Sequence, residues 1–136
     1  MSDYGKPLPR PSTATRPFWD GCREGELRLP WCRACGRPHF FPRSLCPHCL
    51  ATDLEWRRAS GRGVVWSFST VRLSFWGKAF DDAVPYVVAM VELEEGVRVL
   101  SNVVGCAPGA VRIGLPVEVT FDAVTPEFTL PRFRPA

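Results

Sequence analysis

The sequence predicts a mainly β protein in which an N-terminal helix and a small metal-binding module precede a five-stranded barrel. Three observations lead to this fold class. The 136 residues include 14 prolines and 11 glycines, which favour short elements joined by turns. Four of the six cysteines form two C-x-x-C pairs that are ten residues apart. Five short segments rich in β-branched and aromatic residues follow them, with no long helical pattern in between.

Composition and charge limit the classes of function that this protein can have. Hydrophobic residues make up 46% and charged residues 23%, as in globular domains with a packed core. The formal charge of +3 is too small to favour a dedicated nucleic-acid binder. Residues 1–16 hold no apolar stretch, and no window approaches the ~20 apolar residues of a membrane span, so we expect a cytoplasmic protein without a signal peptide. A reducing compartment favours metal binding over disulfides.

The N-terminal third is expected to be an arm followed by one short helix. Residues 1–14 contain three prolines and little to bury, which indicates an extended arm. Thr15 can cap a helix, which Gly25 limits to about three turns. Because so short a helix is unstable alone, its aromatic pair, Phe18 and Trp19, is expected to dock on another surface.

The cysteine pairs predict one structural zinc site. Each C-x-x-C turn can direct two sulfurs at one ion, and two such turns complete a tetrahedron. The ligands are Cys32, Cys35, Cys46 and Cys49. Four thiolates leave no open coordination position, so the metal is expected to be structural. A rubredoxin-like iron site would use the same ligands and stays open at this point.

The other residues of this segment are interpreted as supporting the metal or the ribbon around it. His39 and His48 are interpreted as ordinary residues of the ribbon rather than ligands. Backbone amides near Gly36 are expected to offset the charge of the thiolates, together with Arg33, Arg37 and Arg43.

Five predicted strands follow the cysteines. The third and fourth of them are joined by a hairpin turn at Glu94-Glu95-Gly96. Five short strands with one long member fit a small closed barrel, of which the OB-fold is the commonest form. We therefore expect a helix plus ribbon over 15–52, a barrel over 53–124 and a C-terminal tail over 125–136. The expected strands are 54–58, 64–73, 86–93, 97–104 and 115–124.

No catalytic constellation is predicted. Cys106 has no histidine beside it in sequence, and both histidines lie in the ribbon, so it is interpreted as a buried structural thiol. Exposed aromatics beside basic residues can stack single-stranded bases on an OB-fold, which leaves nucleic acid as an alternative ligand. The residues that could do so are Trp66, Phe68, Phe75 and Trp76, with Arg72 and Lys78 on phosphates.

A set of short motifs resembles the zinc-ribbon OB-fold proteins of the DUF35 type, from about Arg16 to Pro135. Their order and spacing agree along almost the whole chain. The motifs are Gly25-Glu26-Leu27, Cys32-x-x-Cys35-Gly36, Phe41-Pro42-Arg43, Cys46-Pro47-x-Cys49, Ser60-Gly61-x-Gly63, Pro85-Tyr86-Val87, Gly114-x-Pro116-Val117-Glu118-Val119 and Pro131-x-Phe133-x-Pro135.

The resemblance implies an accessory subunit without catalytic residues of its own. Its partner would be a thiolase-superfamily enzyme, either a thiolase or an aldolase of steroid side-chain degradation, or else a MaoC-like enoyl-CoA hydratase. The chain would stabilise this partner in a hetero-oligomer and help to wall its acyl-CoA site. The residues expected to contact the partner are Phe18, Trp19, Phe75, Trp76 and Phe80, and those expected to contact CoA phosphates are Arg43, Arg72 and Lys78.

Overall fold

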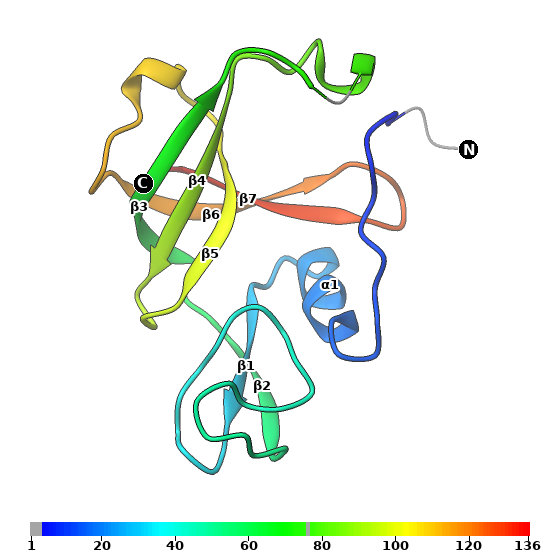
Figure 1. Ribbon diagram of the computed structural model, residues 1–136, viewed down its shortest axis with the longest axis vertical. Helices are drawn as coiled ribbons and strands as arrows, with labels where there is room; N and C mark the ends of the chain where they lie inside the picture. Colours follow the sequence, from blue (N-terminus) through cyan, green and yellow to red (C-terminus); the bar gives the residue numbers. More distant parts are fainter. Residues whose placement is uncertain (1–3, 76) are drawn as a thin grey trace.

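The computed structural model describes residues 4–75 and 77–136 (Figure 1). A ribbon module with one helix lies at one end of the molecule, and a β-barrel forms the rest. The elements are α1 (Arg16–Arg23), β1 (Arg28–Cys32), β2 (Leu54–Arg58), β3 (Arg62–Val71), η1 (Gly77–Phe80), β4 (Tyr86–Leu93), β5 (Arg98–Val103), η2 (Pro108–Ala110), β6 (Pro116–Ala123) and β7 (Thr129–Pro135). The predicted fold class is confirmed. No helix in the described part of the chain is long and apolar enough to cross a membrane.

The ribbon has its own two-stranded sheet, which the sequence did not reveal. β1 pairs antiparallel with β2 from Arg28↔Arg58 to Cys32↔Leu54. The segment 54–58 is therefore a ribbon strand, and its prediction as the first barrel strand was wrong. The cause lies in its partner: Pro30 sits in the middle of β1 and removes a backbone donor, so this segment did not have the composition of a strand.

The barrel is closed by the segment that we expected to be a tail. Its strand order is β3-β4-β5-β7-β6. β7 pairs antiparallel with β6 from Val117↔Pro135 to Ala123↔Thr129, and it meets β5 in parallel at Val103↔Phe133. The tail boundary at residue 125 was thus wrong. Pro131 and Pro135 lie within β7 and weaken its strand signal, although both are tolerated there.

β3 is long, as predicted for the segment 64–73, and it is bent. A β-bulge between Val65 and Ser67 changes the register of β3 against β4. A Cβ atom on Gly63 would lie 2.4 Å from the backbone oxygen of Glu92, so this position accepts only glycine without a shift. β4 alternates between buried and half-buried residues, so it faces the core on one side rather than being buried on both.

Helix α1 spans eight residues, which is shorter than the three turns predicted. It begins after a reciprocal pair of hydrogen bonds, in which the Ser12 amide donates to Thr15 Oγ1 (2.8 Å) and the Thr15 amide to Ser12 Oγ (3.2 Å). Phe18 and Cys22 of α1 join one apolar core with the barrel residues around Phe133. The helix therefore ties the ribbon to the barrel.

Candidate functional site

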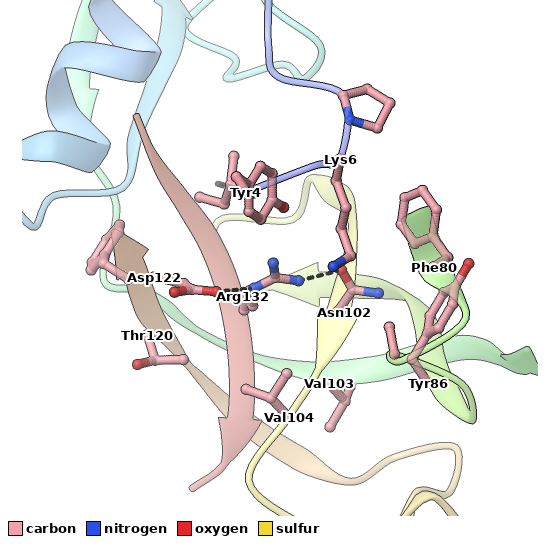
Figure 2. Close-up of a pocket in the computed structure, with 14 residues that line it drawn as sticks. Tyr4, Lys6, Phe80, Tyr86, Asn102, Val103, Val104, Thr120, Asp122 and Arg132 are labelled. Carbon is pink, nitrogen blue, oxygen red and sulfur yellow. Dashed lines mark hydrogen bonds and ion pairs between the residues drawn. The ribbon is translucent and has the colours of Figure 1, made fainter. Parts of the chain in front are cut away.

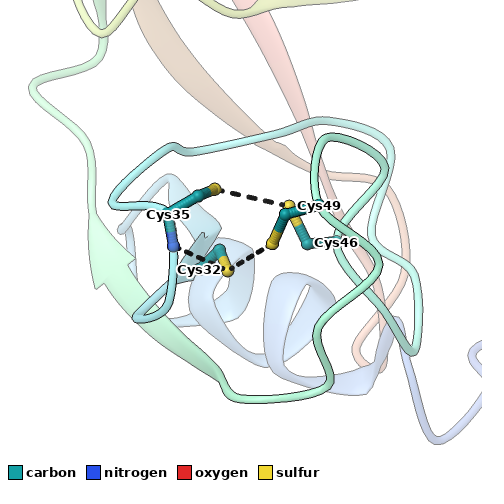
Figure 3. A group of neighbouring side chains, drawn as sticks. All are labelled: Cys32, Cys35, Cys46 and Cys49. Atoms are coloured by element: carbon teal, nitrogen blue, oxygen red, sulfur yellow. Dashed lines mark hydrogen bonds between the residues drawn. The ribbon is translucent and has the colours of Figure 1, made fainter.

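The four predicted metal ligands converge at the end of the ribbon (Figure 3). Cys32 ends β1, and the other three cysteines lie in the loop that leads to β2. All four sulfurs lie within 4.8 Å of one another; Cys32 Sγ is 3.6 Å from Cys49 Sγ and Cys35 Sγ is 3.7 Å from Cys46 Sγ. Four sulfurs at about 2.3 Å from one Zn²⁺ would be about 3.8 Å apart, so these spacings suit a tetrahedral ion.

Tight turns create this geometry. Gly36 adopts φ +75°, where a side chain would be strained, and its amide donates to the Cys32 carbonyl (2.8 Å). Two backbone amides donate to sulfurs: Cys35 N–H to Cys32 Sγ (3.4 Å) and His48 N–H to Cys46 Sγ (3.3 Å). As expected, the backbone offsets thiolate charge. Such amides orient the ligands and stabilise the bound form.

Arg33 has a different role from the expected one, which was to offset the charge of the thiolates. Its guanidinium donates to the carboxylates of Asp53 (2.9 Å) and Glu55 (3.1 Å), and these bonds raise the pKa of Arg33. The pKa of Glu55 is lowered, mainly by its hydrogen bond with Arg57 and further by Arg33. Arg33 thus braces the first C-x-x-C turn against β2 rather than neutralising the thiolates. The reason is that two carboxylates lie beside it, those of Asp53, just before β2, and Glu55, within β2.

Neither histidine belongs to the sulfur cluster. His48 Nε2 lies 3.4 Å from the Pro38 carbonyl at the surface. His39 is buried, and no described residue hydrogen-bonds to its ring nitrogens. Burial lowers the pKa of His39, and His48 and Arg43 lower it further, so the ring is neutral at pH 7.

The remaining thiols are consistent with a structural interpretation. Cys22 is buried in the shared core, and this burial raises its pKa to about 12, against a smaller opposing effect of Arg28. A thiol with this pKa stays protonated and is a poor nucleophile. Cys106 is half-buried and packs against the same core.

A cavity of 730 Å³ opens on the side of the barrel, between the N-terminal arm and the loop that contains η1 (Figure 2). Its floor is a polar chain: Arg132 donates to Asp122 (2.8 Å) and Asn102 (2.9 Å), and Asn102 donates to the Val87 carbonyl (2.9 Å). The rings of Tyr4 and Phe80 form part of its rim. The Lys6 ammonium lies 5.3 Å from the centroid of the Tyr4 ring and 5.6 Å from that of the Phe80 ring. A site of this kind suits a ligand with both polar and flat apolar parts.

Sequence reasoning missed most of this cavity. The β6–β7 pairing brings the elements of Asp122 and Arg132 together, and that pairing was hidden while 125–136 was interpreted as a tail. Asn102 lies on β5, a strand that was predicted, but nothing in its local sequence indicates a cavity. Of the predicted site residues that the structure describes, only Phe80 lines this cavity.

The predicted CoA residues do not form one cluster. Arg72 follows β3 and Lys78 lies in η1. Both are exposed and belong to the loop between β3 and β4, which is called the barrel loop below. Arg43 is exposed in the ribbon, whose loops lie at the opposite end of the molecule from that loop (Figure 1). One small ligand bound at the barrel loop would therefore be within reach of the loop residues and not of the ribbon.

The predicted docking residues also divide. Phe18 is only 3% exposed and packs on Trp19 (ring centroids 5.0 Å apart) and Phe40 (5.4 Å), so its assignment to a partner surface was wrong. Trp19 lines a 300 Å³ groove between ribbon and barrel. Phe75 is 84% exposed, Phe80 is half-buried, and Trp76 lies outside the described residues.

Comparison with known proteins identifies the family. The family model of the ChsH2 rubredoxin-like zinc ribbon domain matches residues 19–55, and that of the ChsH2 C-terminal OB-fold domain matches residues 56–122. A DUF35 domain-containing scaffold protein of Methanothermobacter thermautotrophicus is 42% identical over 97 residues, which are 71% of each chain. This chain belongs to the DUF35 family. Its predicted structural zinc is confirmed, since the ribbon is of the zinc type and holds the clustered cysteines.

Two further similarities are to proteins described as an enzyme or an enzyme subunit. A probable enoyl-CoA hydratase alpha subunit of Thermomonospora curvata is 39% identical over 130 residues. The match covers 94% of this chain but 40% of that protein, so the chain spans less than half of it. A solved structure described as Ltp2-ChsH2(DUF35) aldolase matches with a TM-score of 0.84 and 36% identity, covering 94% of this chain and 98% of that one.

Proposed function

We propose that this DUF35 chain is a non-catalytic accessory subunit that docks on a thiolase-superfamily enzyme, a thiolase or a steroid side-chain aldolase. It stabilises this enzyme and helps to form its acyl-CoA site, while the partner supplies the catalytic residues. The observation that carries the proposal is the full-length likeness to the chain described as Ltp2-ChsH2(DUF35) aldolase. The scaffold names of other relatives support an accessory role.

The loop between β3 and β4 is the best candidate for the docking surface. Leu73 is 69% exposed and Phe75 is 84% exposed, and both are large apolar side chains on one short segment. Burying such a side chain in an interface contributes about 1.5–3 kcal/mol. Phe80 supports the loop from below, with its ring 6.0 Å from that of Tyr86. A partner that covers this loop would also close the entrance of the 730 Å³ cavity, which the loop borders.

Arg72 and Lys78 are the proposed contacts for CoA phosphates. They flank Phe75 in the sequence, and neither forms an ion pair with a carboxylate in the described part of the chain. Their charges are therefore available to an anionic ligand. Arg43 would contact a partner or solvent instead, because the ribbon lies at the other end of the molecule.

Affinity capture with the tagged full chain tests the docking proposal. We expect a thiolase-superfamily enzyme, identified by mass spectrometry, whose solubility or activity falls when the chain is omitted. The double variant Leu73→Ser/Phe75→Ser should weaken binding at least tenfold, or about 1.4 kcal/mol. Leu100→Ser is the matched control, since Leu100 is a 63% exposed apolar residue on β5. Equal losses in both variants, or no such enzyme in the capture, would contradict the proposal.

A MaoC-like enoyl-CoA hydratase is the second candidate partner. The likeness to the hydratase alpha subunit of Thermomonospora curvata favours it. The same capture experiment separates the two candidates, because a hydratase and a thiolase differ in their peptides and in the reaction they perform. Tight binding of single-stranded oligonucleotides with a steep salt dependence, and no enzyme partner, would instead favour the nucleic-acid alternative.

A further inference from the structure

The C-terminal half of β3 has a strand on one side only (Figure 1). Its pairing with β6 covers Arg62 to Val64, and the next residue, Val65, bonds to the loop before β6 through Gly114 (2.8 Å) and Leu115 (3.0 Å). Beyond Val65, the register continues with β4 alone, as far as Val71↔Tyr86. The barrel therefore has an open edge near the loop that leads to η1.

The register identifies which backbone groups point out of this edge. The Glu94 amide donates to the Arg62 carbonyl, so even-numbered residues of β4 direct their backbone toward β3. The Leu93 amide donates to Val97, which confirms that odd-numbered residues face β5. Ser67, Ser69 and Val71 stand opposite the even-numbered β4 residues.

Phe68 and Thr70 therefore direct their N–H and C=O groups away from β4. No other described residue bonds to these four groups. The side chains around them are accessible as well, since residues 66–69 are all exposed. The edge presents a donor, an acceptor, a second donor and a second acceptor in strand geometry.

The composition of this edge indicates that another chain covers it when the protein functions. Residues 63–71, Gly-Val-Val-Trp-Ser-Phe-Ser-Thr-Val, contain no charge and no proline and have high β-propensity. Soluble proteins usually protect exposed edges with lysine, proline or a charged inward-facing residue, because an unprotected edge pairs with other chains. The segment lacks all of these devices, although its bulge bends it.

Charge around the edge indicates the kind of strand that would fit. Two exposed arginines lie near its two ends along the chain: Arg72 follows the end of β3, and Arg112 lies two residues before Gly114, which bonds to Val65. Neither forms an ion pair within the described residues. An uncharged strand with acidic residues at its ends would complement them.

We propose that the open edge of β3, at Phe68 and Thr70, binds an extended segment of the partner enzyme by strand addition. The segment has an uncharged centre and acidic flanks, and it pairs through its backbone. This inference rests on the proposed function for the class of the partner, but it adds how the partner is held. This extended segment of the partner would lie next to the loop that contains the exposed Phe75, because that loop continues from the same strand.

A proline at residue 70 tests the pairing. Thr70→Pro removes an N–H that points out of the edge and leaves the β3–β4 bonds in place, so the barrel should fold. Thr70→Ala is the matched control, because it changes the side chain and keeps the N–H. We expect Thr70→Pro to bind the captured enzyme at least tenfold more weakly than Thr70→Ala. Equal binding by the two variants would overturn strand addition and leave the proposed function standing.

Hydrogen exchange in the unmodified protein covers the case in which the proline variant misfolds. The amides of Phe68 and Thr70, which point out of the edge, should exchange at least tenfold more slowly once the enzyme is added. Unchanged exchange in a formed complex would overturn the inference, as would dimerisation of the chain alone through this edge, seen by light scattering. If the wild-type chain binds no thiolase-superfamily enzyme, both proposals fail.

Discussion

The ribbon and the barrel maintain their structures by different means. The distal ribbon, from Arg33 to Asp53, has no paired strand of its own, and its buried residues are few: His39, Pro42 and Cys46. The barrel instead has a core of large, fully buried side chains, with Phe133 at its centre and valines around it. A segment with so little apolar burial cannot offset its conformational entropy by packing, whereas the barrel can. The metal therefore replaces a core in one region.

Metal removal should have the largest effect and should divide the two regions. Structural zinc contributes about 10–16 kcal/mol in small zinc modules, far more than any single side chain. We expect a chelator, or Cys35→Ser, to abolish protection from hydrogen exchange over residues 33–53. The barrel amides should remain protected, since α1 and β1 are anchored in the shared core. Exchange by mass spectrometry, with zinc content measured in parallel, checks this outcome.

The control for this experiment is Cys106→Ser, which removes a half-buried thiol outside the metal cluster. It should keep full zinc content and the wild-type exchange pattern. A Cys35→Ser protein that retains full zinc and a protected ribbon would refute the four-ligand site. Loss of protection throughout the barrel would show that the two regions do not differ in the way described.

The second prediction concerns the barrel core. Phe133 of β7 is fully buried opposite Val119 and Val103, and its carbonyl accepts from the Val104 amide (2.7 Å). Phe133→Ala should lower the free energy of unfolding by about 3–5 kcal/mol through lost burial and a cavity. Urea unfolding at saturating zinc measures it. The exposed Phe75 provides the matched control, as Phe75→Ala should change stability little. A loss below about 1 kcal/mol for Phe133→Ala would mean that β7 is not essential to the core.

The same contrast explains how far the sequence alone could lead. The metal site depends on cysteine spacing within 18 residues, so the identity of its four ligands was readable directly. The barrel depends on pairings between distant strands. Its last strand was missed, and so was the first strand of the ribbon sheet, for one physical reason. Proline lowers strand propensity, and both unrecognised strands, β1 and β7, contain it.

The candidate binding features divide in a similar way. Phe75, which was expected to contact a partner, is exposed. The side chain of Phe18 has the same chemistry, but α1 turns it toward Phe40 in the chain's own core. The floor of the cavity, with Arg132, and the open edge at Phe68 are both products of register. Register requires the paired strand to be known, and periodicity within one segment cannot supply it.

The smallest predicted effect lies where the two regions meet. Cys22 of α1 is buried in the shared core, and its pKa is raised to about 12 by burial, whereas a thiol in the unfolded chain titrates near 9.0. Below pH 9 both states hold the proton and Cys22 adds no pH dependence. Above it the unfolded chain releases the proton first, so stability falls with rising pH by up to about 1.4 kcal/mol per unit until pH 12.

The variant Cys22→Ala isolates this contribution. It should lose some stability at every pH because a small cavity forms, but its stability should decline less steeply than that of the wild type between pH 9 and pH 11. Urea unfolding at a series of pH values, followed by circular dichroism with zinc present, gives both slopes. Val99→Ala serves as the control, since it opens a small cavity in the same core without removing a titratable group and should keep the wild-type slope. Parallel slopes for wild type and Cys22→Ala would mean that α1 opens to solvent before the barrel unfolds, and that the ribbon is joined to the barrel less firmly than their common core implies.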